Sequence, residues 1–197
     1  MILKRKIYKK LLEWKKECQG KKALLIEGAR RIGKSTICEE FGKSEYKSFL
    51  LIDFAKKDKE VEGYFEKYLN DLDTFFMLLQ THFGTKLTER NSLIIFDEVQ
   101  MFPQARAAIK YLVADGRYDY IEIGSLISIR ENVKNIVIPS EERHINMYPL
   151  DFEEFAIALE EDLLVEYIKK CFEKKEPLER SMHNQAMLLF HQYMLVG

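Results

Sequence analysis

The feature that most constrains this chain is a pair of glycines followed by lysine and serine, set between an apolar run and an amphipathic segment. The sequence from 24 to 41 reads LLIEGARRIGKSTICEEF, so Gly28, Gly33, Lys34 and Ser35 fit the pattern G-x-x-x-x-G-K-[ST]. Glycines permit backbone angles that other residues avoid, and N–H groups at the start of a helix form a cradle for phosphate. The lysine of this pattern reaches the β- and γ-phosphates of a nucleotide, and the serine hydroxyl ligates Mg²⁺. The stretch predicts a strand, a phosphate-binding loop and a helix in that order.

The whole loop is expected to line the bound phosphates. Its residues are Gly28, Ala29, Arg30, Arg31, Ile32, Gly33, Lys34, Ser35 and Thr36. The motif does not require the two arginines, and two interpretations stay open: they are solvated side chains at the loop tip, or one of them contacts a phosphate or a neighbouring subunit. For the stretch as a whole, the alternative is a glycine-rich turn that holds no ligand.

A second cluster closes the apolar run SLIIFDE at residues 92–98. Phosphoryl transfer from a nucleotide needs a carboxylate to hold Mg²⁺ and a group that positions or deprotonates water. Asp97 suits the first role, through the water shell of the metal, and Glu98 suits the second. A glutamate in this place favours ATP hydrolysis over GTP hydrolysis of the Ras type. In the alternative interpretation, Glu98 caps the next helix or pairs with a lysine.

Three further polar residues lie close to the expected ends of strands. Ser125 closes the run YDYIEIGS, and because ligands bind outside the carboxyl ends of strands, it can orient the attacking water. The equally open alternative is that Ser125 caps a helix starting at Leu126. Asp53 is either a partner of the metal site, an acceptor for an arginine, or a turn residue at the strand end. Gln100 either hydrogen-bonds the water or enters the next helix.

Apolar runs alternate with segments of helical periodicity along the first 150 residues, which favours a parallel sheet covered by helices on both faces. Strands are expected at 23–27, 47–54, 92–98, 118–125 and 143–150, and helices at 5–18, 34–41 with Gly42 as the end, 58–83, 103–114 and from 151 onward. The expected fold is therefore α/β, a three-layer P-loop domain over residues 1–150, followed by a helical segment over residues 151–197.

Composition excludes a strong general attraction to nucleic acid or membrane. The 197 residues carry a net charge of −1, although residues 1–22 hold nine Lys/Arg against two Glu. The three cysteines lie far apart, which indicates reduced thiols in a cytoplasmic protein. No apolar run reaches the roughly 20 residues that a membrane span needs.

Several stretches together resemble one family. LKRKIYKKLLEWKK, IEGARRIGKST, LIIFDEVQ, Gly124–Ser125 and YPLDFEEF resemble the prokaryotic AAA-type ATPases whose core is followed by a C-terminal domain of unknown function. The resemblance implies a five-stranded sheet in which the fourth strand separates the first from the third. It also implies an arginine that stabilises the γ-phosphate from a partner or another domain. Arg143 is the first candidate and Arg130 the reserve, although Glu142 can pair with Arg143 and neutralise it.

The expected function is Mg²⁺-dependent binding and hydrolysis of ATP, coupled to movement of a domain or partner. ATP and Mg²⁺ are the expected ligands. The apolar tail LLFHQYMLVG resembles the opening of the family's C-terminal domain. A homo-oligomer or a protein partner is therefore expected, bound through a missing C-terminal part. The alternative is a nucleotide-gated DNA-binding or scaffold module with little hydrolysis, motivated by the basic N-terminal segment. A small-molecule kinase is disfavoured, because no arginine-rich lid is apparent.

Overall fold

The computed structural model describes residues 5–125 and 141–196. The chain divides into two compact units, Lys10–Met147 and Met1–Lys9 together with Tyr148–Gly197. The first unit contains a parallel sheet with flanking helices, and the second is helical.

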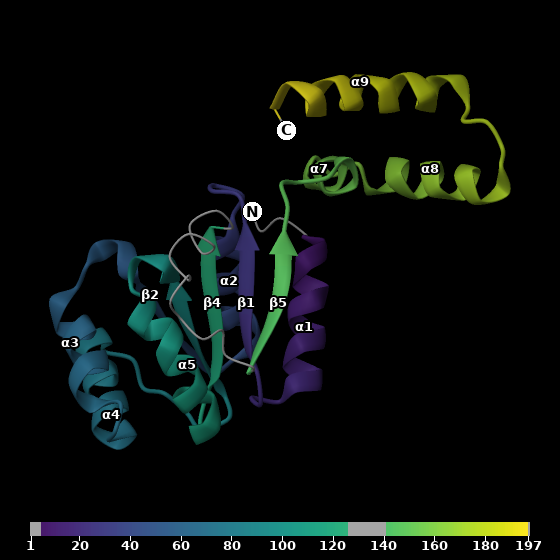
Figure 1. Ribbon diagram of the computed structural model, residues 1–197. Coiled ribbons are helices and arrows are strands. Elements are labelled where there is room, and N and C mark those ends of the chain that lie inside the picture. The colour runs from purple at the N-terminus through teal and green to yellow at the C-terminus, as the bar shows by residue number, and fades with distance from the viewer. Residues whose placement is uncertain (1–4, 126–140, 197) are drawn as a thin grey trace. The chain divides into compact units, whose positions relative to one another are not determined.

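Among the described residues, five strands form one parallel sheet in the order β2-β3-β4-β1-β5 (Figure 1). Their bounds are β1 Ala23–Gly28, β2 Ser48–Asp53, β3 Ser92–Asp97, β4 Asp119–Ser125 and β5 Glu142–Met147. The central strands β3 and β4 are buried at every residue, as expected for strands covered on both faces. The predicted α/β fold is confirmed, and β4 lies between β1 and β3 as the family resemblance implied.

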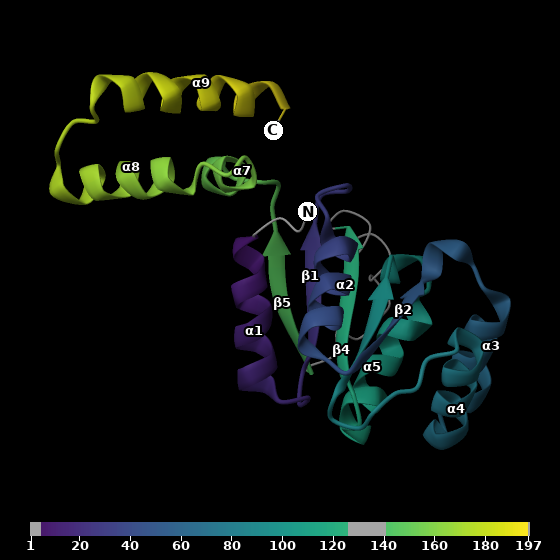
Figure 2. The same ribbon diagram turned by 180° about the vertical axis from the view of Figure 1, so that it is seen from behind.

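Helices cover the sheet on both faces. Helix α5, Pro103–Asp115, lies on the face toward the viewer in Figure 1, and α2, Lys34–Glu45, lies on the opposite face, as Figure 2 shows. Helix α1, Lys6–Cys18, buries Trp14 with its ring centroid 6.5 Å from that of Phe41 on α2. The predicted start of α5 at a proline is confirmed, since proline at the first turn removes only an N–H that has no helical partner.

The segment 58–83, expected as one helical stretch, forms two helices. They are α3, Lys59–Tyr68, and α4, Leu72–Phe83, and each begins after an aspartate. The side chain of Asp58 accepts from the N–H groups of Glu60 and Val61, and that of Asp71 accepts from the N–H of Thr74. The second aspartate therefore starts a new helix inside the predicted one.

Aromatic side chains pack against one another in the core between these helices and the sheet. Phe65 lies with its ring centroid 5.0 Å from Phe75 of α4 and 5.6 Å from Phe96 of β3. The buried aromatic members of this core are Phe54, Phe65, Phe75, Phe76, Phe96, Phe102, Tyr118 and Tyr120.

The prediction that Gly42 ends the helix after the phosphate loop is wrong. Helix α2 continues to Glu45, and Gly42 is buried inside it. A Cβ atom at Gly42 would lie 2.9 Å from the Cβ and Cγ atoms of Phe49 on β2. The glycine therefore lets the helix approach the strand, and it is not a terminator.

Three strands end earlier than predicted, and the first of them is β2, which ends at Asp53 rather than at residue 54. Strand β3 ends at Asp97, so Glu98 lies just beyond it and precedes the short 3-10 helix η2, Val99–Met101. Strand β5 ends at Met147 rather than at residue 150.

The helical unit contains α7, Phe152–Ala158, α8, Asp162–Lys174, and α9, Arg180–Val196. Asp151 and Glu154 form a reciprocal capping box at the start of α7. Glu154 also accepts the backbone N–H of Lys6 and pairs with Arg5 at 3.2 Å, which ties the first described residues of the chain to this unit. No helix among the described residues has the length and apolarity to cross a membrane.

Candidate functional site

The phosphate loop begins where β1 passes between two neighbouring strands. Gly28 lies opposite Ser125 of β4 on one side and Met147 of β5 on the other. A Cβ atom at Gly28 would lie 2.3 Å from the carbonyl oxygen of Met147 and 2.8 Å from the Cδ1 of Ile32. The predicted reason for this glycine, an unusual backbone angle, is wrong, because Gly28 is not among the residues with positive φ. Close approach of the β5 backbone requires it instead.

The second glycine has the predicted role. Gly33 has φ of 87° and ψ of 23°, and it caps the amino end of α2 in the left-handed conformation. A Cβ atom there would meet nothing within 4 Å, so only the backbone angle favours glycine. Arg31 also has a positive φ, 63°, which is uncommon for a residue other than glycine.

Lys34, the first residue of α2, folds back over the loop. Its ammonium donates to the carbonyl oxygens of Gly28 at 3.1 Å and Ala29 at 2.6 Å. Burial lowers the pKa of Lys34, while the carboxylates of Glu98 and Asp97 act in the opposite direction. The ammonium therefore already lies in the loop, and phosphate oxygens would compete with two carbonyls for its protons.

Ser35 and Asp97, the two predicted Mg²⁺ ligands, are in contact. The Ser35 side chain lies close enough to the Asp97 carboxylate to lower its pKa, and the backbone N–H of Glu98 donates to Asp97 Oδ1 at 2.9 Å. Burial raises the pKa of Asp97, and the nearby Ser35 hydroxyl and the Glu98 N–H lower it. A hydroxyl and a carboxylate supply the oxygen ligands that Mg²⁺ prefers, so the residues present fit this ion.

Glu98 has an unusual backbone and a partner that the sequence analysis did not expect. Its φ is 50° and its ψ is 44°, and its side chain makes no capping hydrogen bond to η2. The carboxylate instead accepts a hydrogen bond from the amide of Gln100, which is buried. Gln100 lies in η2, and its side chain holds Glu98. The sequence DEVQ contains this pair, but only the 3-10 turn brings the two side chains together.

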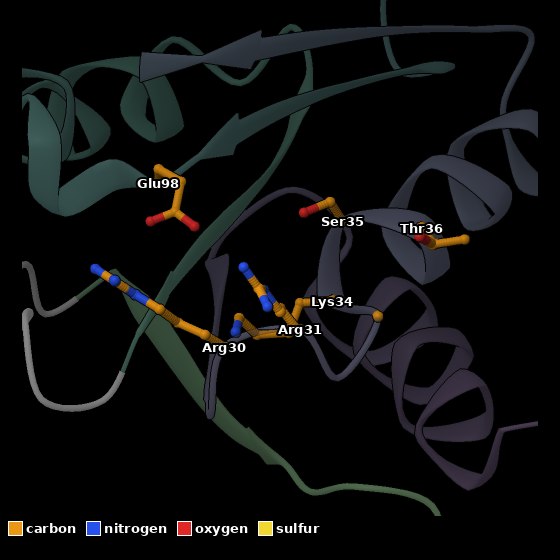
Figure 3. Close-up of a pocket in the computed structure, with 7 residues that line it drawn as sticks. Arg30, Arg31, Lys34, Ser35, Thr36 and Glu98 are labelled. Carbon is orange, nitrogen blue, oxygen red and sulfur yellow. The ribbon is translucent and has the colours of Figure 1, made fainter. Parts of the chain in front are cut away.

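Glu98 and the loop line one pocket of about 310 Å³. In Figure 3, Glu98 faces the loop residues across this pocket. The lining residues are Arg30, Arg31, Gly33, Lys34, Ser35, Thr36 and Glu98. The pocket thus contains three cationic side chains, a hydroxyl at the helix start and a carboxylate, an arrangement suited to a polyphosphate.

The ends of strands β4 and β2 place two further predicted residues, Ser125 and Asp53, at different distances from a role in the site. Ser125 is the last residue of β4 and is level with Gly28 in the sheet, beside the start of the loop. Its alternative as a cap for a helix from residue 126 concerns residues outside the described part. Asp53 lies opposite Asp97, but its side chain accepts the N–H of Ala55 and caps the short helix η1, Phe54–Lys56. The turn interpretation of Asp53 therefore matches its contacts.

Arg143 lies at the other end of the sheet from the loop. It is opposite Leu24, whereas Met147 is opposite Gly28, and four residues of strand span about 13 Å. Its guanidinium pairs with Glu17 at 2.5 Å. Arg143 thus does not serve the loop of its own chain, and its role toward a neighbouring chain stays a prediction. The reserve candidate, Arg130, lies outside the described residues.

The pairing of Glu142 with Arg143 that the sequence allowed does not form, because neighbouring residues of a strand point to opposite faces. Glu142 pairs with Arg106 of α5 at 3.0 Å, with both side chains buried, and His144 Nε2 lies 3.2 Å from the same carboxylate. Glu122 of β4 is a further buried member of this cluster of charged side chains. Burial raises the pKa of Glu122 well above its usual value, helped by the charge of Glu142, while Arg106 acts in the opposite direction. Sequence reasoning missed this cluster; the signal was one glutamate inside the apolar run YDYIEIGS.

The sheet order, the loop between β1 and α2, and the acidic end of β3 define a P-loop protein of the nucleotide-binding, ATPase-like class. A family model described as an AAA domain matches residues 20–156, and the chain belongs to this family. The match includes the whole loop, Asp97, Glu98 and Ser125. No curated protein matches the chain in sequence.

Proposed function

We propose that this protein binds ATP together with Mg²⁺ and hydrolyses its terminal phosphoanhydride bond. The observation that carries the proposal is the position of Ser35 beside Asp97, where the end of the phosphate loop meets the acidic end of β3 at the edge of the loop pocket. Two oxygen ligands for a divalent cation thus lie beside the pocket that Lys34 and Glu98 line.

Each residue has a distinct part in the proposed reaction. The backbone N–H groups at the start of α2 and the Lys34 ammonium bind the β- and γ-phosphates. Ser35 and Asp97 would hold the Mg²⁺, which would neutralise charge on the phosphate oxygens. The Glu98 carboxylate takes a proton from the attacking water, and Gln100 keeps that carboxylate oriented. Ser125, level with Gly28, orients the same water.

We further propose that the nucleotide state moves a domain or a protein partner, as the AAA family suggests. The alternative of a DNA-binding module gains little support from the contacts of the basic N-terminal segment. Arg5 pairs with Glu154, and Lys6 lies 2.6 Å from Asp151 and 2.8 Å from Glu153, so part of the basic charge is already neutralised.

The test is binding of a fluorescent ATP analogue, with and without Mg²⁺, followed by measurement of phosphate release. We expect Mg²⁺-dependent binding, and we expect Lys34→Ala to weaken it, because the ammonium is the main side-chain charge on the phosphates. Lys43→Ala is the control, since Lys43 lies on the same helix but pairs with Glu39 at 3.6 Å. Equal affinity of the wild-type protein and Lys34→Ala would refute the phosphate-loop assignment.

Salt-dependent binding of duplex DNA tests the alternative. Counterion release makes such binding fall steeply with salt concentration. We expect weak or no binding. Tight binding that is lost on neutralising Lys9 and Lys10, which are exposed, would favour the DNA-binding module instead.

A further inference from the structure

Two arginines at the tip of the phosphate loop have no counter-ion in the described structure. Arg30 and Arg31 are exposed and line the pocket opposite Glu98 (Figure 3). Among residues 5–125 and 141–196, neither forms an ion pair or a side-chain hydrogen bond. Five other described arginines do form ion pairs, and Arg180 on α9 does not; the five are Arg5, Arg90, Arg106, Arg117 and Arg143.

The charge of the pocket is therefore unbalanced. Arg30, Arg31 and Lys34 face a single lining carboxylate, Glu98. The pKa of Lys34 is lowered mainly by burial, with the nearby charge of Arg30 as a smaller contribution in the same direction. Cations that repel one another in this way are stabilised by a ligand of high negative charge. A nucleoside triphosphate supplies more of that charge than a diphosphate does.

The chemistry of the two side chains suits the end of a phosphate chain. A guanidinium donates through a planar fork that matches phosphate oxygens, and it keeps its charge at any physiological pH. Arg31 also holds a left-handed backbone with φ of 63°, where glycine or asparagine would be less strained. Such backbone strain concentrates at ligand sites. An arginine at this position places a cation at the tip of the loop despite its backbone cost.

We propose that Arg30 and Arg31 bind the terminal phosphate from within the same chain and make the site prefer a nucleoside triphosphate to a diphosphate. The inference rests on the proposed function, and it assigns to the loop a selectivity that the motif itself does not provide. It is independent of Arg143, which is paired with Glu17 at the other end of the sheet.

The first test compares affinities for a non-hydrolysable ATP analogue and for ADP, both with Mg²⁺, in Arg30→Gln, Arg31→Gln and the double variant. Charge-assisted bonds are roughly twice as strong as neutral ones, so we expect the double variant to lose about tenfold or more in affinity for the triphosphate and less than about threefold for ADP. Arg180→Gln is the matched control, because Arg180 is exposed and lies on α9, outside the phosphate loop. An equal loss for both nucleotides, or no loss for either, overturns the selectivity.

The proposed function and the selectivity of the loop arginines can be disproved separately. If Lys34→Ala weakens both nucleotides while the arginine variants behave like Arg180→Gln, the proposed function stands and the inference is wrong. If the wild-type protein binds neither nucleotide, both are wrong.

The second test asks whether the cations act within one chain. The double arginine variant is mixed with Glu98→Gln, and steady-state phosphate release is measured. If each chain uses its own loop arginines, no mixed site is complete and we expect no recovery of activity. Recovery toward the wild-type rate would mean that the arginines serve a neighbouring chain, which contradicts the proposal.

Discussion

The Ser35 side chain lies beside the Asp97 carboxylate and lowers its pKa, so the first turn of α2 and the end of β3 meet at the carboxyl end of the sheet. Asp97→Asn keeps the size of the side chain and removes its charge. We expect it to abolish most of the Mg²⁺ dependence of nucleotide binding, while affinity without Mg²⁺ changes little. Titrating a fluorescent ATP analogue at several Mg²⁺ concentrations measures this.

Asp53→Asn is the matched control for that measurement. Asp53 is level with Asp97 on the neighbouring strand but caps η1. A Mg²⁺ dependence that is unchanged in Asp97→Asn, or reduced equally in Asp53→Asn, would argue against the metal assignment.

Substitutions at Glu98 and Gln100 should lower the rate of ATP hydrolysis without lowering the affinity for ATP. If Glu98 is the base, Glu98→Gln should bind ATP normally and hydrolyse it at least about 10²-fold more slowly. Gln100→Leu removes the donor that holds the Glu98 carboxylate, so we expect a smaller loss in kcat with unchanged ATP affinity. Steady-state kinetics and equilibrium binding on the same preparations provide both readouts, and thermal melting identifies any unfolded variant. Wild-type turnover in Glu98→Gln would show that another group activates the water.

Alanine substitutions at the two loop glycines should destabilise the protein for different reasons. Gly28→Ala places a Cβ against the Met147 carbonyl, and overpacking of this kind costs about 1–3 kcal/mol, so the free energy of unfolding should fall. Gly33→Ala meets no neighbour but forces alanine into a left-handed conformation, at a cost of roughly 1–2 kcal/mol. We expect the first to disturb the strand pairing of β1 with β5 and the second to act mainly on the loop. Urea unfolding together with amide hydrogen exchange on β5 distinguishes them; equal protection of β5 in both variants would contradict the assignment.

Glu122 should make stability depend on pH. Its pKa in the folded state is raised well above that of an exposed glutamate, so the folded protein holds a proton that the unfolded chain has released. The free energy of unfolding should therefore fall as pH rises above the unfolded pKa of about 4.3, by up to about 1.4 kcal/mol per pH unit until the folded pKa is reached. Glu122→Gln, which cannot ionise, should lack this slope.

The control for the pH experiment is Glu66→Gln, since Glu66 is exposed on α3. Urea unfolding at a series of pH values from 5 to 9 gives the slopes. A wild-type slope in Glu122→Gln would mean that the buried carboxyl does not carry the extra proton.

Short sequence patterns correctly predicted those features of the fold that depend only on a residue and its immediate neighbours in the sequence. The buried strand before Gly28, the left-handed Gly33 and the proline at the start of α5 follow from residue type and immediate neighbours. The order of strands came from the family resemblance, because periodicity alone does not say which strands are neighbours.

Three of the errors share one physical origin, which is contact between residues distant in sequence. Gly42 resembles a helix end locally, yet Phe49 of β2 explains it. Glu142 has Arg143 beside it in the sequence, yet its charge is neutralised by Arg106 of α5. The close neighbour of Gly28 is Met147, on a strand that begins more than a hundred residues later. Such partners are fixed by the assembled sheet, so the sequence near each residue cannot reveal them.

The hydrogen bonds from Lys34 to the carbonyls of Gly28 and Ala29 have a consequence for the way a ligand enters. They fasten the loop to the helix that follows it, so the binding shape exists before any phosphate arrives. Little conformational entropy remains to be lost on association, and such preorganisation raises affinity. The incoming phosphate exchanges one set of oxygen acceptors for another around an ammonium that is already in place. When the nucleotide enters, phosphate oxygens therefore replace the carbonyl oxygens around the Lys34 ammonium, and the loop does not need to fold around the ligand.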